Sequence, residues 1–592
     1  MIVPMKKVFL LIQQARGPAV LERLRQLGVV HVEHENVPQG TELNEINEKL
    51  NLIENTRSIL SALSQEHLLK PLVYKSEDWM VVCRHVIALQ KKYDQLKEYA
   101  VSLGLIIDFW EDWGDFDPEQ VKALQRKNIR IKLYQIPKTK IKGLPQGIIL
   151  KEIFQEGQLA NCLVISTGDI ELGFKEIELP KSSLSQMKRR LSEDAKIMQE
   201  IRVEIAGHLV FQKELVEVER SFLSQKDFYT VLRGMGKVDQ LIYLKGYIPV
   251  DAEAELIKQS KINSWGILTL DPGSDDAVPT LTRNPAWVAL IKPLLKLLEL
   301  VPGYNEIDIN PVFIVFFSLF FGILIGDAGY GLVYFLLNFW LYKKIGHKTK
   351  DKSAFFLFYI LSFCAIIWGL LTGTFFGQEW LLKIGIKPLL PALTNTVFIQ
   401  ALCFFIGAVH LSLAHGWRAI LKAPALTALA DLGWICVIWA VFFLAKNLIL
   451  GDSFPSFGSW LIIAGLVLVL FFTNPQKNIF KTIGEGLGAI ALSLVNNFTD
   501  VVSYIRLFAV GLAGVAIADA FNAMAAGVVK KGDFLTFIAA ALIVVFGHAL
   551  NIILGPMSVL VHGVRLNVLE FCGHANVTWS GFVYKPFSNE EQ

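Results

Sequence analysis

Two arginines lie deep inside long apolar segments near the carboxyl end of the sequence. Arg506 stands about twenty residues from either end of the segment 486–528, and Arg565 lies in the last such segment, 534–573. A helix rises about 1.5 Å per residue, so the Arg506 side chain cannot reach the membrane surface unless its helix is heavily tilted. A guanidinium keeps its proton, and its insertion at the centre of a membrane costs at least about 3 kcal/mol. A charge kept at that cost indicates a function inside the membrane.

Polar side chains continue from each arginine along one face of its predicted helix. The first face has steps of three and four residues and comprises Asn496, Asp500, Ser503 and Arg506. The second has similar steps, with Gly555 in its one gap, and comprises His548, Asn551, Ser558, His562 and Arg565. Such a face suits a helix that lines a water path or meets a charged partner. The alternative is a hydrogen-bond network that only joins helices, but two permanent cations on neighbouring segments would repel each other there.

Other candidate residues are better explained by structure. His410 and His415 lie on one apolar helix and are interpreted as interior histidines rather than metal ligands. Asp327, in the GDAGYG turn, is expected to close the link between two apolar segments. The GMGKV segment at 234–238 lacks the first glycine and the Ser or Thr of a phosphate-binding loop. The sequence therefore predicts no cofactor, metal or nucleotide site.

The composition changes along the chain and predicts two unlike parts. The mean hydropathy is +0.43 although 19% of the 592 residues are charged. Residues 1–300 are rich in charge, and apolar stretches of membrane-spanning length recur from about Pro311. We therefore predict a cytoplasmic arm at 1–300 and an all-α transmembrane domain at 301–592. The net charge of only +3 gives no support for nucleic-acid binding.

About eight membrane spans are predicted in the second part, the last two long and tilted. They are expected at about 310–325, 327–343, 354–375, 396–416, 427–449, 457–473, 486–528 and 534–573. The apolar run after Lys6 and Lys7 is too short for a signal peptide, so the amino terminus is expected in the cytoplasm. An even number of spans then places both termini of a multi-pass cell-membrane protein in the cytoplasm.

The distribution of basic loop residues supports this orientation. Nine fall on the cytoplasmic side, namely Lys343, Lys344, Lys348, Lys350, Lys352, Arg418, Lys422, Lys477 and Lys481. Five fall on the outer side, namely Lys383, Lys387, Lys446, Lys530 and Lys531.

The charged arm is predicted to be an α/β dumbbell. Short strands and a helix indicate a near lobe at 1–40 and 230–295, and an α/β segment at 110–180 would form a far lobe. Apolar residues at heptad spacing indicate a paired, coiled-coil-like helical rod at 43–107 and 183–225. The heptad positions are Ile46, Leu50, Ile53, Leu60 and Leu63 in the first helix and Leu184, Met187, Leu191, Met198, Ile201 and Ile205 in the second. Two ordinary helices in a globular core are the alternative.

Several motifs resemble one family across nearly the whole chain. They are YNEIDINP (304–311), FGILIGDAGYG (321–331), GAVHLSLAHG (407–416), NNFTDVVSYIRLFAVGLAG (496–514), GHALNIILGPMSVLVHGVRLNVLEF (547–571) and YKPF (584–587). These stretches are similar to the membrane stator subunits of V-type and archaeal-type rotary ATPases, called subunit a or subunit I, in their shorter prokaryotic form. In the first half the resemblance rests on architecture, on KKV near the start and on GYIP near the end.

The resemblance implies a non-catalytic subunit that carries ions past a rotor ring. Two aqueous half-channels would open to opposite sides of the membrane, with an arginine between them facing a carboxylate on the ring. Arg506 matches the family's essential arginine and Arg565 its second one. The half-channel candidates are Asn496 and Asp500 on the cytoplasmic side, His548, Asn551 and Ser558 on the external side, and also Ser503, His562 and Glu570. Glu570 is expected to be a partner of Arg565 or a group facing the rotor.

The implied partners are a ring of proteolipid subunits, peripheral-stalk subunits, a central-stalk connector subunit, the soluble ATPase sector and membrane lipid. One departure stands out, because some relatives carry a histidine eight residues after the first arginine and a glutamate ten residues before the second. Here these positions are Gly514 and Gly555. The sequence leaves open which groups relay the ion on the external side, and whether that ion is a proton or sodium.

Two other functions stay open at this point. A secondary ion transporter would move ions by substrate exchange without a rotor, and a non-conducting anchor would only hold a complex in the membrane. Transporters usually have duplicated halves with broken helices, and no such repeat is found in this sequence. An anchor would leave the two buried arginines without a role.

Overall fold

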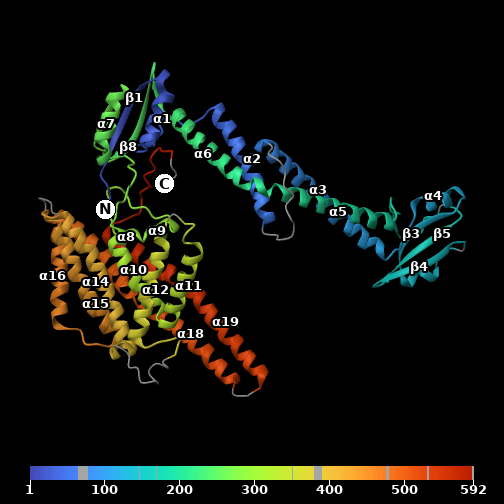
Figure 1. Ribbon diagram of the computed structural model, residues 1–592. Helices are drawn as coiled ribbons and strands as arrows, with labels where there is room; N and C mark the ends of the chain where they lie inside the picture. Colours follow the sequence, from blue (N-terminus) through green and yellow to red (C-terminus); the bar gives the residue numbers. More distant parts are fainter. Residues whose placement is uncertain are drawn as a thin grey trace. The chain divides into compact units, whose positions relative to one another are not determined.

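The chain forms two compact units in a computed structural model, and each unit is built from separated segments (Figure 1). The first unit comprises Met1–Leu11, Leu27–Glu33 and Lys245–Ser588, and the second comprises Ile12–Gln26 and His34–Leu244. The structure describes all residues except 65–77, 144, 146, 169, 350, 379–389, 475–478, 530–532 and 590–592. The predicted boundary at residue 300 differs from this division, because strands from the start of the chain belong with the later segments.

Long helices dominate the second unit. They are α2 (Thr41–Ser64), α3 (Trp79–Glu111), α5 (Leu184–Gly207) and α6 (Gln212–Gly234), and they follow the short helix α1 (Gly17–Leu27). Helix α2 packs on α6 and α3 packs on α5. The predicted apolar residues Ile53 and Ile201 are buried in one cluster formed by all four long helices. These contacts join the two predicted stretches, and the coiled-coil rod itself remains a prediction.

Two charged residues, Arg57 and Asp194, lie at heptad positions of the predicted rod, and each has a partner of opposite charge. Arg57 of α2 forms an ion pair with Glu219 of α6. Asp194 of α5 is fully buried and lies 3.1 Å from Nε of Arg190, one turn away on the same helix. Charges inside a helical interface are tolerated when they are paired, which explains why these positions do not break the packing.

A small antiparallel sheet occupies the segment predicted as the far lobe. Its strands are β3 (Arg130–Pro137), β4 (Ile149–Glu156), β5 (Leu159–Ser166) and β6 (Lys175–Ile177), in the order β4-β5-β3-β6. Helix α4 (Pro118–Arg126) precedes the sheet, and the Asp117 side chain caps it by accepting from the Glu119 amide. Tyr134 and Cys162 are among the side chains that form the apolar core of this sheet.

A second sheet joins strands that are far apart in the sequence. It comprises β1 (Met5–Gln13), β2 (His31–Glu33), β8 (Leu241–Pro249) and β9 (Gly266–Leu270), in the order β2-β8-β1-β9, and β7 (Gly236–Val238) pairs with β8. The β1–β9 and β2–β8 pairs are antiparallel. Helix α7 (Val250–Asn263) connects β8 to β9.

The residues just before and just after the apolar helices lie together in the first unit. The Glu306 carboxylate accepts hydrogen bonds from the backbone and the hydroxyl of Thr578, at 2.8 and 2.6 Å. Burial would raise the pKa of Glu306, but these hydrogen bonds and one from the Gly303 amide outweigh it and hold the pKa below its usual value. Tyr584 donates from its hydroxyl to the Val29 carbonyl. The apolar part therefore begins and ends at the same place.

Nine longer helices form the described part of the apolar region. They are α10 (Asn310–Ile325), α11 (Ala328–Ile345), α12 (Ser353–Thr372), α14 (Thr396–Lys422), α15 (Ala428–Leu450), α16 (Ser456–Phe472), α17 (Ile479–Ser503), α18 (Ile505–Val529) and α19 (Phe534–Ser558), and the short α8 (Ala286–Ala289) and α9 (Lys292–Leu297) precede them. A single large apolar cluster packs most of these helices together.

Five segments among the described residues are long and apolar enough to cross a membrane. They are Ser353–Thr372, Thr396–Lys422, Ala428–Leu450, Ser493–Val529 and Phe534–Ala575. Two shorter apolar helices, Asn310–Ile325 and Ser456–Phe472, coincide with two more of the predicted spans, and the eighth falls on α11. Of the basic residues used to predict the orientation, Lys350, Lys383, Lys387, Lys477, Lys530 and Lys531 lie outside the described residues.

The last two apolar segments are not uniform α-helices. Helix α17 ends at Ser503 and α18 begins at Ile505, so the break falls at Tyr504, two residues before Arg506. After α19 the final segment passes through two π-helical stretches, Val559–Gly563 and Leu566–Phe571, and ends with α20 (Cys572–Ala575). Such π-helical turns are uncommon and often occur at functional sites.

Asp327 fixes the turn between α10 and α11. Its side chain is fully buried and accepts hydrogen bonds from the backbone amides of Tyr330, Phe376 and Gly377, at 3.1, 2.9 and 2.8 Å. It caps α11 and also holds the residues that follow α12. Gly369 allows this approach, because a Cβ there would lie 2.0 Å from the Ala328 nitrogen.

We expect Asp327→Ala to lower the unfolding free energy by more than about 3 kcal/mol, because three buried amides would lose a charged acceptor. The matched control is Asp351→Ala, since Asp351 is exposed and accepts from the amide of Ser353, the first residue of α12; its loss should cost only about 1 kcal/mol. The unfolding temperature of the detergent-purified chain measures both changes. Equal effects of the two variants would contradict the role given to Asp327.

Candidate functional site

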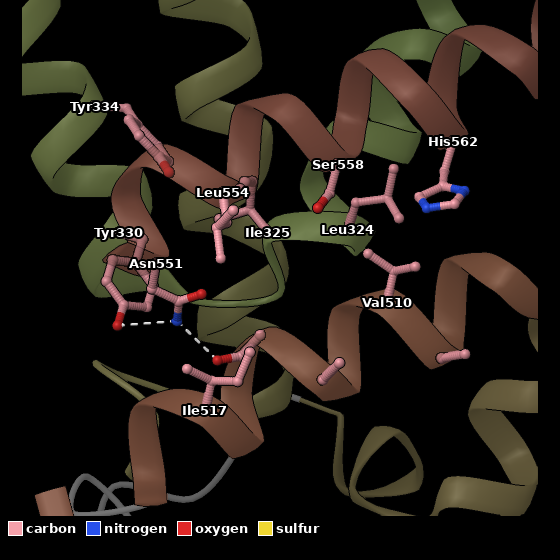
Figure 2. A pocket seen from close by; sticks show the side chains of 14 residues that line it. Leu324, Ile325, Tyr330, Tyr334, Val510, Ile517, Asn551, Leu554, Ser558 and His562 are labelled. Atoms are coloured by element: carbon pink, nitrogen blue, oxygen red, sulfur yellow. Dashed lines mark hydrogen bonds between the residues drawn. The ribbon is translucent and has the colours of Figure 1, made fainter. Parts of the chain in front are cut away.

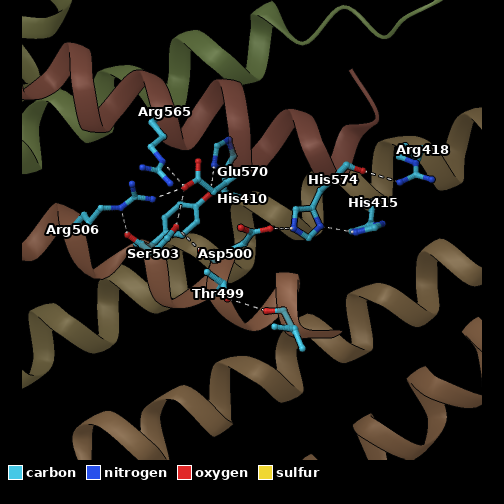
Figure 3. A network of polar contacts seen from close by, with 12 residues as sticks. His410, His415, Arg418, Thr499, Asp500, Ser503, Arg506, Arg565, Glu570 and His574 are labelled. Atoms are coloured by element: carbon cyan, nitrogen blue, oxygen red, sulfur yellow. Dashed lines mark hydrogen bonds and ion pairs between the residues drawn. The ribbon is translucent and has the colours of Figure 1, made fainter. Parts of the chain in front are cut away.

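Arg506 and Arg565 meet at one buried carboxylate (Figure 3). Oε1 of Glu570 pairs with Nη2 of Arg506 and lies 3.5 Å from Nε of Arg565. The Ser503 hydroxyl donates to the same oxygen at 3.3 Å. The Glu570 side chain is only 5% exposed, whereas those of Arg506 and Arg565 are 22% and 56% exposed. The two cations are thus held close together because an anion lies between them.

The irregular backbone explains how these side chains reach one another. The break at Tyr504 frees the Ser503 carbonyl, which accepts a hydrogen bond from Nε of Arg506 at 2.9 Å. Residues five apart in an α-helix point about 140° away from each other, whereas a π-helical turn brings them onto one side. The π-helical stretch Leu566–Phe571 therefore allows Arg565 and Glu570, which are five residues apart, to pair.

Two histidines connect two carboxylates beside this cluster, and Figure 3 shows the histidines and the first carboxylate, Asp500. Nε2 of His574 lies 3.1 Å from Oδ2 of Asp500, and Nδ1 of His574 lies 2.9 Å from Nε2 of His415. Nδ1 of His415 lies 3.2 Å from Oδ1 of Asp431. These contacts form one continuous path across four helices, from α17 through α20 and α14 to α15. Asp500 is the most exposed member, at 28%, and the other three are buried.

Two cations close the far end of this path. Nζ of Lys422 donates to Oδ2 of Asp431 at 2.7 Å, and Nη2 of Arg418 lies 3.4 Å from Oδ1 of the same residue. Arg418 also donates to the His574 carbonyl at 2.9 Å. Both cations thus hold the Asp431 carboxylate in place beside the His415 ring that it contacts.

A cavity of about 360 Å³ lies between α18 and α19 (Figure 2). Its lining runs from Tyr330 and Asn551 at one end to His562 at the other. Val510, one turn after Arg506, and His562, one turn before Arg565, both line it. The cavity therefore ends within about one turn of the two arginines.

The end of the cavity away from the arginines carries a neutral hydrogen-bond network. The Tyr330 hydroxyl lies 2.6 Å from Nδ1 of His548 and accepts a hydrogen bond from the Asn551 amide at 3.1 Å. Nε2 of His548 lies 3.1 Å from Oδ1 of Asn522, and Asn551 also donates to the Gly514 carbonyl at 2.7 Å. In the described contacts around this end, hydroxyl, imidazole and amide groups meet without a charged partner.

The two glycines that depart from the family pattern border this cavity. A Cβ on Gly555 would lie 2.8 Å from the Tyr334 hydroxyl and 2.9 Å from a methyl of Ile325. A Cβ on Gly514 would meet only Oδ1 of Asn551, at 3.8 Å. The Tyr334 hydroxyl, which donates to the Ile552 carbonyl at 2.9 Å, thus occupies the space that a side chain at position 555 would need.

Comparison with curated proteins gives matches along the whole chain. V-type ATP synthase subunit I of Borreliella burgdorferi is 30% identical over 617 residues and covers 99% of both chains. The chain belongs to the V-type and A-type ATP synthase subunit I family. V-type ATP synthase subunit I 1 of Treponema pallidum is 29% identical, over 99% of this chain and 100% of its own. The resemblance predicted from the motifs is therefore confirmed, although no family model matches the chain.

Comparison with solved structures also gives a match. It is the cytoplasmic N-terminal domain of a subunit I that is described as a homologue of subunit a of V-ATPase. It covers 45% of this chain and 100% of its own, with 14% sequence identity and a TM-score of 0.19. That score is too low to define a common fold.

The structure brings most of the predicted residues of this subunit I chain into two neighbouring groups. Arg506, Arg565, Ser503 and Glu570 form the ion-pair cluster. Asn551, Ser558 and His562 line the cavity, and His548 bonds to Tyr330, which lines it too. Asp500 instead joins the histidine path. Asn496 is exposed and makes no described hydrogen bond with either group, whereas its neighbour Asn497 is buried.

Several members of these groups were not predicted as site residues. His574, Asp431 and His415 form the path from Asp500, and Tyr330 and Asn522 bond to His548. The sequence could have identified Asp431 as a candidate, because a carboxylate near the start of an apolar helix needs a polar or charged partner. The interior position expected for His410 agrees with the structure, in which it stacks between Phe316 and Phe571 and bonds to the Tyr504 hydroxyl.

We expect Gly555→Ala to destabilise the membrane part by about 1–3 kcal/mol, because the new methyl collides with Tyr334 and Ile325. Gly514→Ala is the matched control and should be tolerated. Adding Tyr334→Phe to Gly555→Ala should recover part of the loss, since it removes the hydroxyl that the methyl meets. The unfolding temperatures of these variants in detergent measure the effect. A wild-type value for Gly555→Ala would contradict the close packing of Gly555 against Tyr334 and Ile325.

Proposed function

We propose that this chain is the ion-translocating stator subunit of a V/A-type rotary ATPase and has no catalytic activity of its own. The observation that carries the proposal is the buried meeting of Arg506 and Arg565 at Glu570, directly beside a cavity. The names of the full-length relatives support membership of an ATP synthase complex. Its partners would be a proteolipid ring, the peripheral and central stalks, the soluble ATPase sector and membrane lipid.

The proposed topology has eight spans and both termini in the cytoplasm. The hydrogen bonds between Glu306 and Thr578 support an even number of crossings, because the chain enters and leaves the apolar part at one place. In this orientation the final segment runs inward, so Arg565 lies nearer the cytoplasm than Asn551. Helix α17 enters from the cytoplasm, so Asp500 lies on the cytoplasmic side of Arg506.

Two half-channels follow from this topology. The cavity between α18 and α19 would be the external one, with Tyr330, His548 and Asn551 at its outer end and His562 at its inner end. Asp500 would begin the cytoplasmic one. Arg506 lies between the two, so an ion has no direct path from one to the other and must travel on the ring.

Arg506 would carry the electrostatic step. A neutral ring carboxyl can move through lipid, whereas an ionised one is strongly disfavoured there. A fixed guanidinium beside the ring carboxyl favours its ionised form and so promotes release of the ion into the adjoining half-channel. The same charge repels cations that would cross between the half-channels. Glu570 would hold Arg506 in place from the side away from the ring, since it pairs with the guanidinium through one end only.

Replacement of Arg506 tests this function. Arg506→Ala and Arg506→Gln should abolish ATP-driven pumping in assembled complexes, and Arg506→Lys should restore little because lysine lacks the planar fork and can lose its proton in a dry site. Arg565→Ala should be milder, since that side chain is 56% exposed and solvent can partly replace it. Ion uptake into reconstituted vesicles measures the effect, with assembly checked separately on native gels.

Near-normal coupled pumping by Arg506→Ala would refute the assignment of this residue. Purification distinguishes the rival functions, because only a rotary subunit should co-purify with a proteolipid ring and ATPase subunits. A secondary transporter or a simple anchor would be isolated without the ring.

The arm would act as a bracket that resists torque, with its small sheet β4-β5-β3-β6 bound to a peripheral stalk. Joint contacts of α2, α3, α5 and α6 around Ile201 support a stiff connection. The proposed domains are the arm at 1–300, with its lobes and rod as predicted, and the ion-translocation domain at 301–592.

Charges placed at Leu191 and Ile201 test the bracket. Leu191→Glu with Ile201→Glu should either block assembly or uncouple ATP hydrolysis from pumping, because Ile201 is only 4% exposed and a carboxylate there has no partner. The membrane helices should still insert. The matched control on the exposed face of the same helix is Ser192→Glu with Gln199→Glu. Unchanged coupling in the first double variant would count against the bracket.

A further inference from the structure

We propose that Asp500, His574, His415 and Asp431 form a binding site for one exchangeable proton, so that the ion carried by this subunit is the proton. The inference rests on the proposed function for its role in transport, but the site itself can be tested without transport. Figure 3 shows Asp500, His574 and His415 in a row between the ion-pair cluster and Arg418.

A count of hydrogen atoms is the first step. Three contacts join the four side chains in series, at 3.1, 2.9 and 3.2 Å, and each is a hydrogen bond only if one proton lies in it. Two neutral imidazoles carry two ring protons, and two ionised carboxylates carry none. The complete path therefore contains one proton more than its groups hold in their ordinary neutral and ionised forms. That proton can sit on either imidazole or on Asp500.

Without the extra proton, the path loses a hydrogen bond. With the two ring protons directed at the carboxylates, Nδ1 of His574 and Nε2 of His415 would face each other as two lone pairs only 2.9 Å apart. Turning the His415 proton into that contact leaves its Nδ1 lone pair facing the Asp431 carboxylate at 3.2 Å, and turning the His574 proton leaves its Nε2 lone pair facing Asp500 at 3.1 Å. A lost hydrogen bond between buried groups is costly, so this geometry favours the state with the extra proton.

Surrounding charges make the proton exchangeable rather than fixed. The cations that face the path are Arg418 and Lys422 on α14, and both contact Asp431. The other titratable neighbours are His410, which is close to His574, and Tyr504, which is close to Asp500; these two bond to each other. With neutral imidazoles, these two cations balance the carboxylates of Asp431 and Asp500. The extra proton then gives the site a net charge of one, which favours its release. Asp500 is the exit, because it is the most exposed member, whereas Asp431 is closed off by its two cations.

The site would act between the ring and the cytoplasm. A proton released by the ring carboxyl binds at Asp500 or His574, and water beyond Asp500 later receives a proton from the same end. Reversal of these transfers loads the ring. Sodium cannot replace the proton here, because nitrogen lone pairs at 2.9 Å leave no room for an ion between them and hard cations prefer oxygen ligands.

Solid-state NMR of the complete complex, with ¹⁵N label in histidine only, tests the site directly. We expect imidazolium nitrogen signals at neutral pH that disappear in both His574→Gln and His415→Gln. Glutamine can keep one donor and one acceptor in the path but cannot hold the extra proton. The control His347→Gln changes an exposed histidine outside the site and should leave these signals unchanged. Absence of an imidazolium signal that depends on both residues would overturn the proposal.

Ion pumping by the same variants tests whether transport uses this proton site. Assembled His574→Gln complexes in sodium-free vesicles should pump protons at least about tenfold more slowly, in the range typical for the loss of a proton-transfer group. A wild-type rate would show that the path only joins helices. If a variant fails to assemble, the unmodified complex still decides the matter, because two ring nitrogens only 2.9 Å apart give a ¹⁵N–¹⁵N correlation that singles this pair out from the other histidines. Three protonated nitrogens in that pair at neutral pH would support the proposal, and only two would overturn it. Loss of pumping in Arg506→Ala is independent of these results, so failure of this proposal and failure of the proposed function can be distinguished.

Discussion

A charge buried among apolar helices must have a partner, and this constraint shapes the membrane part of the chain. Arg506 and Arg565 share the Glu570 carboxylate, and Asp431 is held by Arg418 and Lys422. Breaking a buried pair by removing one partner costs about 3–5 kcal/mol, because the other charge is left alone. Each group of charges therefore fixes the helices that carry it, and the cavity lined by α18 and α19 ends within about one turn of the two arginines.

The backbone departs from regular α-helical geometry where charged side chains have to reach their partners. Helix α17 ends at Ser503 so that Arg506 can bond to the freed carbonyl, and the π-helical stretch Leu566–Phe571 turns Glu570 toward Arg565. Lipid cannot satisfy a free carbonyl or amide, so such irregularities persist only where side chains or water replace the lost hydrogen bonds. The irregular backbone and the buried charges thus depend on each other.

The sequence predicted the arginines, their polar faces and most of the helices, because a charge in an apolar run and a three- or four-residue period are local signals. It did not predict the path from Asp500 through His574 and His415, which joins helices that are far apart in the sequence. The predicted polar face that contains Asn496, Asp500 and Arg506 assumes one continuous α-helix. In the structure the helix is interrupted at Tyr504, and Asn496 is exposed whereas its neighbour Asn497 is buried. Such departures depend on tertiary contacts that no periodicity records.

The two sides of the arginine cluster differ in their chemistry. On the side of Asp500, two carboxylates flank two adjacent histidines, and two cations hold the carboxylate of Asp431. On the side of the cavity, Gly514 and Gly555 remove the side chains that some relatives carry, and Tyr334 fills part of the space. The groups that remain there, Tyr330, His548 and Asn551, are hydrogen-bonded and lack a charged partner in the described contacts. The cavity therefore has an uncharged end around Tyr330 and Asn551 and, within about one turn of its other end, a charged group in which Arg506 pairs with the Glu570 carboxylate.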